Sequence, residues 1–234
     1  MHAVERLYKI RRPGGSPQYV VERAGEFLAC QLTEADPFSG YQIGAAVPGG
    51  IEGATLLAPV QPSKIVCVGL NYTDHAAEVR KPLPAEPLLF IKPSTAVLDP
   101  GAAILLPPGV GRVDYEGELA VVIGRRAHRV PRQDAWRYVF GLMCLNDVTA
   151  RDLQNRESQY TRAKGFDTFA PMGPCVAVGA GPEPRTVETW VNGVRKQQSS
   201  TAQLIFGIEQ LIEFITFVMT LEPGDVVSTG TPSG

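Results

Sequence analysis

Short apolar runs alternate with glycine, proline and polar turn residues along most of the chain. Runs of this length that are rich in β-branched and aromatic residues are typical of strands. They predict strands at Val4–Ile10, Gln18–Arg23, Lys64–Leu70, Pro87–Pro93, Val121–Ile123 and Tyr138–Asn146. The 24 glycines and 20 prolines fit a strand-rich fold with many turns. The pattern therefore predicts a mainly β (α+β) protein with a few helices.

One hairpin and one long helix stand out from this pattern. Asn192-Gly193 separates two β-rich runs and is the strongest hairpin signal in the chain. The helix is predicted from apolar residues that recur at spacings of four and three and so share one face: Leu204, Ile208, Leu211, Ile215 and Val218.

Two shorter helices are predicted from their capping residues. Thr73 or Asp74 is suited to cap a helix that the following prolines end after about two turns. Thr149 and Asp152 fit a capping box, in which the two side chains bond to the first backbone amides of a helix. Lys164–Pro174, rich in turn formers, is predicted to be a loop.

A connector divides the chain into two predicted domains. Each residue before a proline in Leu56–Pro62 is disfavoured in helical conformation, so this segment is expected to be extended. We predict a small β-rich domain over residues 1–60 and a second domain over residues 61–234. Because Thr229–Gly234 is a glycine- and proline-rich loop directly after a strand, we expect further residues after Gly234.

Composition argues against several classes of protein. The 234 residues carry a formal net charge of −2 and no long basic block, so no nucleic-acid partner is expected. The apolar segment Leu204–Leu221 is interrupted by glutamates and predicts no membrane span. Met1–Gly15 lacks the apolar core of a signal peptide. The four cysteines form no CxxC pair, which favours reduced thiols in the cytoplasm.

Three carboxylates at strand ends suggest a metal site. Glu116 and Glu118 lie two apart in a strand and so share a face, where they repel unless one is protonated or a cation lies between them. Asp147 closes a second apolar run. Three converging carboxylates would suit Mg²⁺, Mn²⁺ or Ca²⁺. The alternative is a set of solvated polar strand ends.

Other polar residues are candidates for catalysis. His75 and Glu78 lie three apart on a predicted helix, where a carboxylate orients an imidazole for general base catalysis. Arg151 and Gln154 have the same spacing and are suited to bind an oxyanion. Lys164 and Thr231 lie in loops that could contact an anion. For each of them, an ordinary solvated surface residue is the alternative.

Six segments together resemble the fumarylacetoacetate hydrolase family. They occur in family order across about residues 64–234: Val68–Glu78, Phe90–Ser94, Asp114–Leu119, Asn146–Gln154, Lys164–Phe169 and Pro223–Gly234. The resemblance implies a mixed β-roll or barrel-like catalytic domain, usually in a homodimer. It also implies metal ligands at Glu116, Glu118 and Asp147, which normally hold Mg²⁺.

The resemblance also implies the roles of the remaining site residues. His75 and Glu78 would form a catalytic dyad on a helix that orders over the substrate. The substrate contacts would be Arg151, Gln154, Lys164, Lys92 and Thr231, and Lys164 is a candidate proton donor.

From these residues we expect a metal-dependent enzyme acting on a small 2-oxo acid. The leading hypothesis is hydrolysis of a C–C bond in an acylpyruvate or fumarylpyruvate through a pyruvate enolate. Oxaloacetate decarboxylation and isomerisation of a hydroxymuconate-type dioate are the alternatives. A binding module that holds a metal without catalysis would explain the carboxylates and leave His75 and Glu78 without a role.

Overall fold

The computed structural model describes residues 4–33 and 36–234. Residues 1–3 and 34–35 of the predicted N-terminal domain lie outside these ranges. Residues 1–3 also belong to the segment Met1–Gly15. Within residues 4–33 and 36–234, no helix is both long enough and apolar enough to span a membrane.

The described residues form mostly strands. The strands are β1 Glu5–Arg11, β2 Gln18–Arg23, β3 Glu26–Leu32, β4 Tyr41–Ala46, β5 Thr55–Leu57, β6 Lys64–Gly69, β7 Leu88–Pro93, β8 Val97–Leu98, β9 Val113–Asp114, β10 Gly117–Ile123, β11 Val139–Asn146, β12 Thr149–Ala150, β13 Ala170–Val178, β14 Thr186–Val191, β15 Val194–Ser200 and β16 Val226–Ser228. The helices are α1 Thr73–Glu78, α2 Arg151–Arg156, α3 Thr161–Lys164 and α4 Ile208–Val218, with short 3-10 helices η1 Ser94–Ala96, η2 Arg132–Tyr138 and η3 Thr201–Gln203. The prediction of a mainly β fold with a few helices is confirmed.

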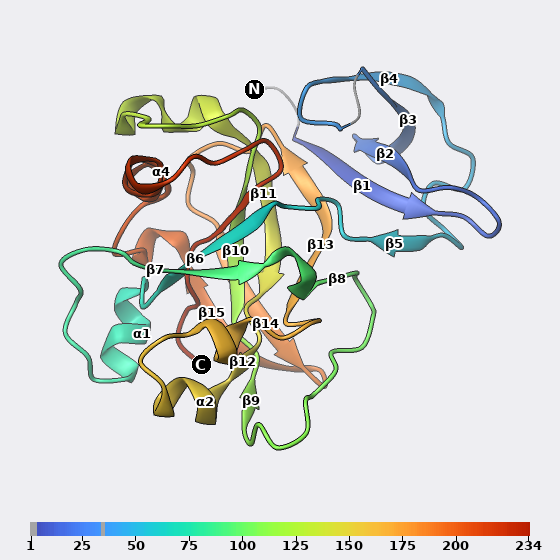
Figure 1. The fold of residues 1–234 in the computed structure, drawn as a ribbon. Helices are drawn as coiled ribbons and strands as arrows, with labels where there is room; N and C mark the ends of the chain where they lie inside the picture. The colour runs from blue at the N-terminus through green and yellow to red at the C-terminus, as the bar shows by residue number, and fades with distance from the viewer. Residues whose placement is uncertain (1–3, 34–35) are drawn as a thin grey trace.

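One large sheet organises the molecule. Within the described ranges it has 12 strands, ten of them in the order β4-β3-β2-β1-β13-β11-β10-β16-β6-β7, with β5 paired to β1 and β8 to β13. Most neighbours are antiparallel, whereas β16 runs parallel to β6. Figure 1 shows β1 to β4 in blue and β5 in cyan as a group beside the rest, joined to it where β1 pairs with β13. The division near residue 60 stays a prediction.

Strand β10 lies in the middle of the core and is buried on both faces. Val121 and Ile123 pack in one apolar cluster with helix α4, whereas Ala120 and Val122 pack in a second cluster with Met143. Burial on both faces explains why this run is continuously apolar instead of alternating. The core thus holds the start of β10, where the acidic residues lie, in a fixed position.

Both predicted caps are wrong. The N-cap residue of α1 is Tyr72, whose side chain makes no capping bond; Asp74 lies inside the helix, where it accepts a hydrogen bond from the amide of the next residue, His75, at 2.7 Å. Helix α2 starts at Arg151 without a side-chain cap, since the Thr149 hydroxyl donates to the Asp147 carbonyl at 2.8 Å and Asp152 accepts from the Arg112 amide at 3.2 Å. Short polar side chains commonly choose such local backbone partners.

Three other local predictions need correction. The predicted loop Lys164–Pro174 contains the start of β13, because Ala170 and Met172 are buried against the core. Leu204 precedes α4 instead of lying on its apolar face. Val218 is 61% exposed, so it lies off the buried face. The hairpin at Asn192-Gly193 is confirmed, with φ of 51° and 74° at these two residues.

Candidate active site

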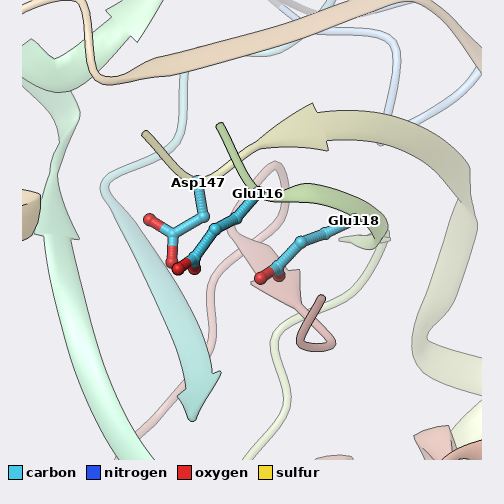
Figure 2. Close-up of side chains that lie close together, drawn as sticks. All are labelled: Glu116, Glu118 and Asp147. Carbon is cyan, nitrogen blue, oxygen red and sulfur yellow. The ribbon is translucent and has the colours of Figure 1, made fainter. Parts of the chain in front are cut away.

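Three carboxylates meet at the junction of β10 and β11. Glu118 is on β10, Glu116 comes just before it, and Asp147 directly follows β11. The two strands pair with Gly117 opposite Asn146, and the amide of Asp147 donates to the Glu116 carbonyl at 2.8 Å. All three residues are buried, and their nearest carboxylate oxygens lie within 4.8 Å of one another (Figure 2). The predicted convergence of the three acids is therefore seen in the structure.

Three cationic side chains surround this carboxylate cluster. Lys164 Nζ donates to Glu116 Oε2 at 2.7 Å and to Asp147 Oδ2 at 2.5 Å. Lys92 Nζ donates to the other Asp147 oxygen at 2.6 Å, and Arg151 donates to Glu116 Oε1. Both lysines are almost fully buried. Each buried ammonium thus has an anionic partner, as burial of a charge requires.

Glu118 differs from the other two acids because its hydrogen bonds come from neutral donors. The Ser228 hydroxyl donates to Glu118 Oε2 at 2.5 Å, and the Gly230 amide donates to the same oxygen at 2.9 Å. Burial, followed by the negative charge of Asp147, raises the pKa of Glu118 to about 8 although the bond from Ser228 opposes the shift. Burial would also raise the pKa of Asp147, but Lys164 and Lys92 outweigh it and lower that pKa.

The carboxylate cluster fits a divalent cation. Its three donors are hard oxygen atoms from separate buried side chains that lie close enough to share one ion. A cation here would relieve the repulsion between Glu118 and Asp147, which the neutral donors of Glu118 leave uncompensated. Three protein ligands on a six-coordinate ion leave positions for water or substrate.

The predicted dyad is formed on α1. His75 Nδ1 lies 2.9 Å from Glu78 Oε2, and the His75 side chain is 25% exposed. A carboxylate at this distance fixes the orientation of the imidazole ring. His75 is therefore suited to accept or deliver a proton on the side of the ring that faces away from Glu78.

A cavity of about 790 Å³ brings the dyad and the carboxylate cluster together. Most of the residues singled out from the sequence line it: His75, Glu78, Glu116, Glu118, Asp147, Arg151, Gln154, Lys164 and Thr231. Lys92 is fully buried and binds Asp147 and the Val148 carbonyl, so its predicted contact with substrate stays a prediction.

Arg151 is held by several protein groups at the edge of this cavity. It donates from Nε to Asp114 Oδ2 at 2.8 Å, and its other nitrogens contact Glu116 and Gln154. Burial lowers the pKa of Arg151, but Glu116 and Asp114 more than offset it, so the pKa is raised. Arg151 is therefore a fixed positive charge on the wall of the cavity.

Two residues that build the site were not predicted from the sequence. Asp114 orients Arg151, and it could have been noticed as a third acid in the Asp114–Leu119 segment. Gln197 on β15 binds the backbone of Gly117 between the two glutamates. No local pattern marks Gln197, because the contact joins residues 80 positions apart.

Known proteins resemble this chain over most of its length. The family model described as fumarylacetoacetate (FAA) hydrolase C-terminal matches residues 64–234. The oxaloacetate tautomerase YisK of Bacillus subtilis is 39% identical, over 99% of this chain and 80% of that protein. The mitochondrial oxaloacetate tautomerase FAHD2B of Bos taurus is 44% identical, over 77% of this chain and 59% of that protein.

Solved structures agree with these relatives. The 2-hydroxyhepta-2,4-diene-1,7-dioate isomerase of Mycobacterium marinum superposes with a TM-score of 0.86 at 38% identity, covering 98% of this chain and 88% of that one. Enzymes of this family act on small molecules and typically use divalent metals. The chain belongs to the fumarylacetoacetate hydrolase family.

Proposed function

We propose that the protein is a divalent-metal-dependent enzyme that interconverts the enol and keto forms of a 2-oxo dicarboxylate. The observation that carries this proposal is the position of the His75–Glu78 dyad and the carboxylate cluster on the walls of one cavity. A proton acceptor and an anion-stabilising centre in one cavity are what enolisation next to a carbonyl needs. The names of the relatives, oxaloacetate tautomerase and dioate isomerase, support a dicarboxylate substrate.

Glu116, Glu118 and Asp147 would hold the metal, with Mg²⁺ as the first choice and Mn²⁺ or Ca²⁺ as substitutes. When bound, the cation would polarise the 2-oxo group and stabilise negative charge on its oxygen. Lys164 and Lys92 would hold Asp147 in place, and Ser228 and Gly230 would hold Glu118. The chain thus fixes the carboxylates before any ligand arrives.

His75 would move the proton, and Glu78 would orient it. Starting from the enol, His75 takes the hydroxyl proton, and the O–H electron pair forms the C2=O2 double bond. The C2=C3 pair then takes a proton at C3, for which Lys164 is the candidate donor. His75 releases its proton to water and Lys164 regains one, so that the substrate is only rearranged. Arg151 and Gln154 would bind the carboxylates of the substrate. Thr231 would line the cavity beside them, because its hydroxyl already donates its proton to the Gly117 carbonyl.

Hydrolysis of a C–C bond in an acylpyruvate is the second candidate function. It is favoured by the exposure of the dyad, since His75 is 25% and Glu78 43% exposed and water can reach them. Here His75 would take a proton from water, the hydroxide would add to the distal carbonyl, and the C–C bond would break to give a pyruvate enolate and an acid. Oxaloacetate decarboxylation would give the same enolate with loss of CO₂ and needs no base for water.

A substrate panel separates these reactions. We would follow the enol absorbance and the products by NMR with Mg²⁺ present for oxaloacetate, a hydroxymuconate-type dioate and fumarylpyruvate. The proposal expects rapid loss of the enol without C–C cleavage. Faster cleavage of fumarylpyruvate than tautomerisation of either dioate would refute it in favour of hydrolysis, and faster release of CO₂ would favour decarboxylation.

Replacing the base tests the role of the dyad. His75→Asn should lower kcat by about 10² to 10⁴-fold, the usual contribution of a positioned acid or base, and should leave Mn²⁺ affinity unchanged. The exposed His128 offers a matched control, since His128→Asn should have wild-type activity. Equal activity in the two variants would contradict the proposed role of His75.

A further inference from the structure

Gln197 uses both ends of its side-chain amide inside the protein. Its Oε1 accepts a hydrogen bond from the Gly117 amide at 3.0 Å. Its Nε2 donates to Thr231 Oγ1 at 2.8 Å and to the Pro232 carbonyl at 2.9 Å. The residue is 3% exposed, so water cannot replace these partners without a rearrangement. One side chain therefore joins the start of β10 to the loop after β16.

The backbone held in this way lies between two of the carboxylates. Gly117 separates Glu116 from Glu118, and its carbonyl accepts a hydrogen bond from Thr231 Oγ1 at 3.1 Å. Both polar groups of the Gly117 backbone are thus fixed by this network. A Cβ at Gly117 would collide with Thr189 Oγ1 on β14, so the hairpin β14–β15 packs directly against the glycine.

The same strand also contacts the helix that carries the dyad. Ser199 on β15 donates from its hydroxyl to Asp74 Oδ2 on α1. Because Gln197 and Ser199 lie two apart, they point to the same face of the strand. Strand β15 therefore contacts the backbone between the glutamates through one residue and the helix of His75 through the other.

We propose that Gln197 is a positioning residue that sets the spacing of the Glu116 and Glu118 carboxylates for the metal ion. This inference rests on the proposed function, because it takes the carboxylate cluster to be a metal site. Gln197 also lines the cavity, but both ends of its amide are bonded to protein groups and not directed to a ligand. It acts by fixing the backbone between the two ligands, and loss of such support typically costs about 10- to 100-fold in metal affinity or activity.

Two substitutions remove the support in different ways. Gln197→Met keeps the length of the side chain and removes all three hydrogen bonds. Gln197→Asn keeps the amide, but it is one methylene shorter and cannot reach both Gly117 and Thr231. The matched control is Gln198→Met, since Gln198 is the next residue of the strand and is exposed.

The test measures Mn²⁺ affinity by calorimetric titration of the full chain, together with the thermal midpoint of each variant. We expect both Gln197 variants to bind Mn²⁺ about 10- to 100-fold more weakly than wild type when folded, and Gln198→Met to bind as wild type does. Unchanged Mn²⁺ affinity with a lower thermal midpoint would overturn the inference, as would failure of both variants to fold, because Gln197 would then serve folding alone. If wild type itself binds no Mn²⁺, the proposed function fails. If wild type and the Gln197 variants bind Mn²⁺ equally well, only the inference about Gln197 fails.

Discussion

Replacing Lys92 by methionine tests whether the ion pairs of the carboxylate cluster stabilise the fold. The Lys92 side chain is fully buried and its Nζ lies 2.6 Å from Asp147 Oδ1 and 3.1 Å from the Val148 carbonyl. Lys92→Met keeps the length and apolar stem of the side chain and removes its charge and donors. Asp147 would keep Lys164 as its only cationic partner among the described residues.

The expected loss follows from the burial of the pair. Removing one partner of a buried ion pair costs about 3–5 kcal/mol of unfolding free energy. Because Lys164 still neutralises Asp147, we expect the lower end, about 3 kcal/mol. For a chain of this size, about 2–4 °C of thermal midpoint is lost per kcal/mol, so the midpoint should fall by about 6–12 °C. At a free concentration 100 times its Kd, Mn²⁺ should raise the free energy of unfolding by about 2.7 kcal/mol in each protein that binds it.

The assay is urea denaturation followed by circular dichroism, with a chelator and then with Mn²⁺. Lys196→Met is the matched control, because Lys196 is exposed. This variant should lose less than about 1 kcal/mol of unfolding free energy. If Lys92→Met lost no more free energy of unfolding than this control, the buried ion pairs would not stabilise the fold. If Mn²⁺ stabilised neither protein, the carboxylate cluster would not be a metal site.

Three further changes have definite expected results. Gly117→Ala should lower Mn²⁺ affinity, measured by titration, by about 10-fold or more, because the new methyl group meets Thr189 Oγ1; wild-type affinity would contradict this. Asp225→Asn should lower the free energy of unfolding, measured by urea denaturation, by about 3–5 kcal/mol. The buried Asp225 carboxylate pairs with Lys64 Nζ at 2.5 Å and accepts a hydrogen bond from the Ser63 amide at 3.0 Å. A loss below about 1 kcal/mol would contradict this. A chelator should abolish turnover and added Mn²⁺ should restore it, whereas turnover that persists in the chelator would exclude the metal. The homodimer predicted from the resemblance is checked by light scattering, which should give twice the chain mass.

Local patterns predicted the strands well where each apolar run ends in turn residues. Asn192-Gly193 predicted its hairpin because both residues readily adopt the positive φ that the turn requires. The start of β13 was missed because Pro171 and Gly173 favour a turn locally, whereas burial of their neighbours against the core places them in a strand. The predicted caps failed because Tyr72 and Ala150, whose side chains make no capping bond, occupy the N-cap positions of the two helices. The Thr149 hydroxyl instead donates to the Asp147 carbonyl.

The candidate site was predictable to the extent that its residues belong to compact motifs. The spacing of Glu116 and Glu118 placed them on one side of the chain, and that of His75 and Glu78 placed them on one helix. The contacts of Gln197 could not be predicted, because its partners lie 80 and 34 residues away in the sequence. Such contacts depend on how the sheet folds, which no local pattern contains.

Anomalous X-ray diffraction from crystals grown with Mn²⁺ tests the metal site most directly. We expect one strong anomalous peak within coordination distance of the carboxylate oxygens of Glu116, Glu118 and Asp147. A saturating Mn²⁺ concentration with no peak between these three residues, or with a peak only elsewhere, would contradict the metal site and with it the proposed chemistry.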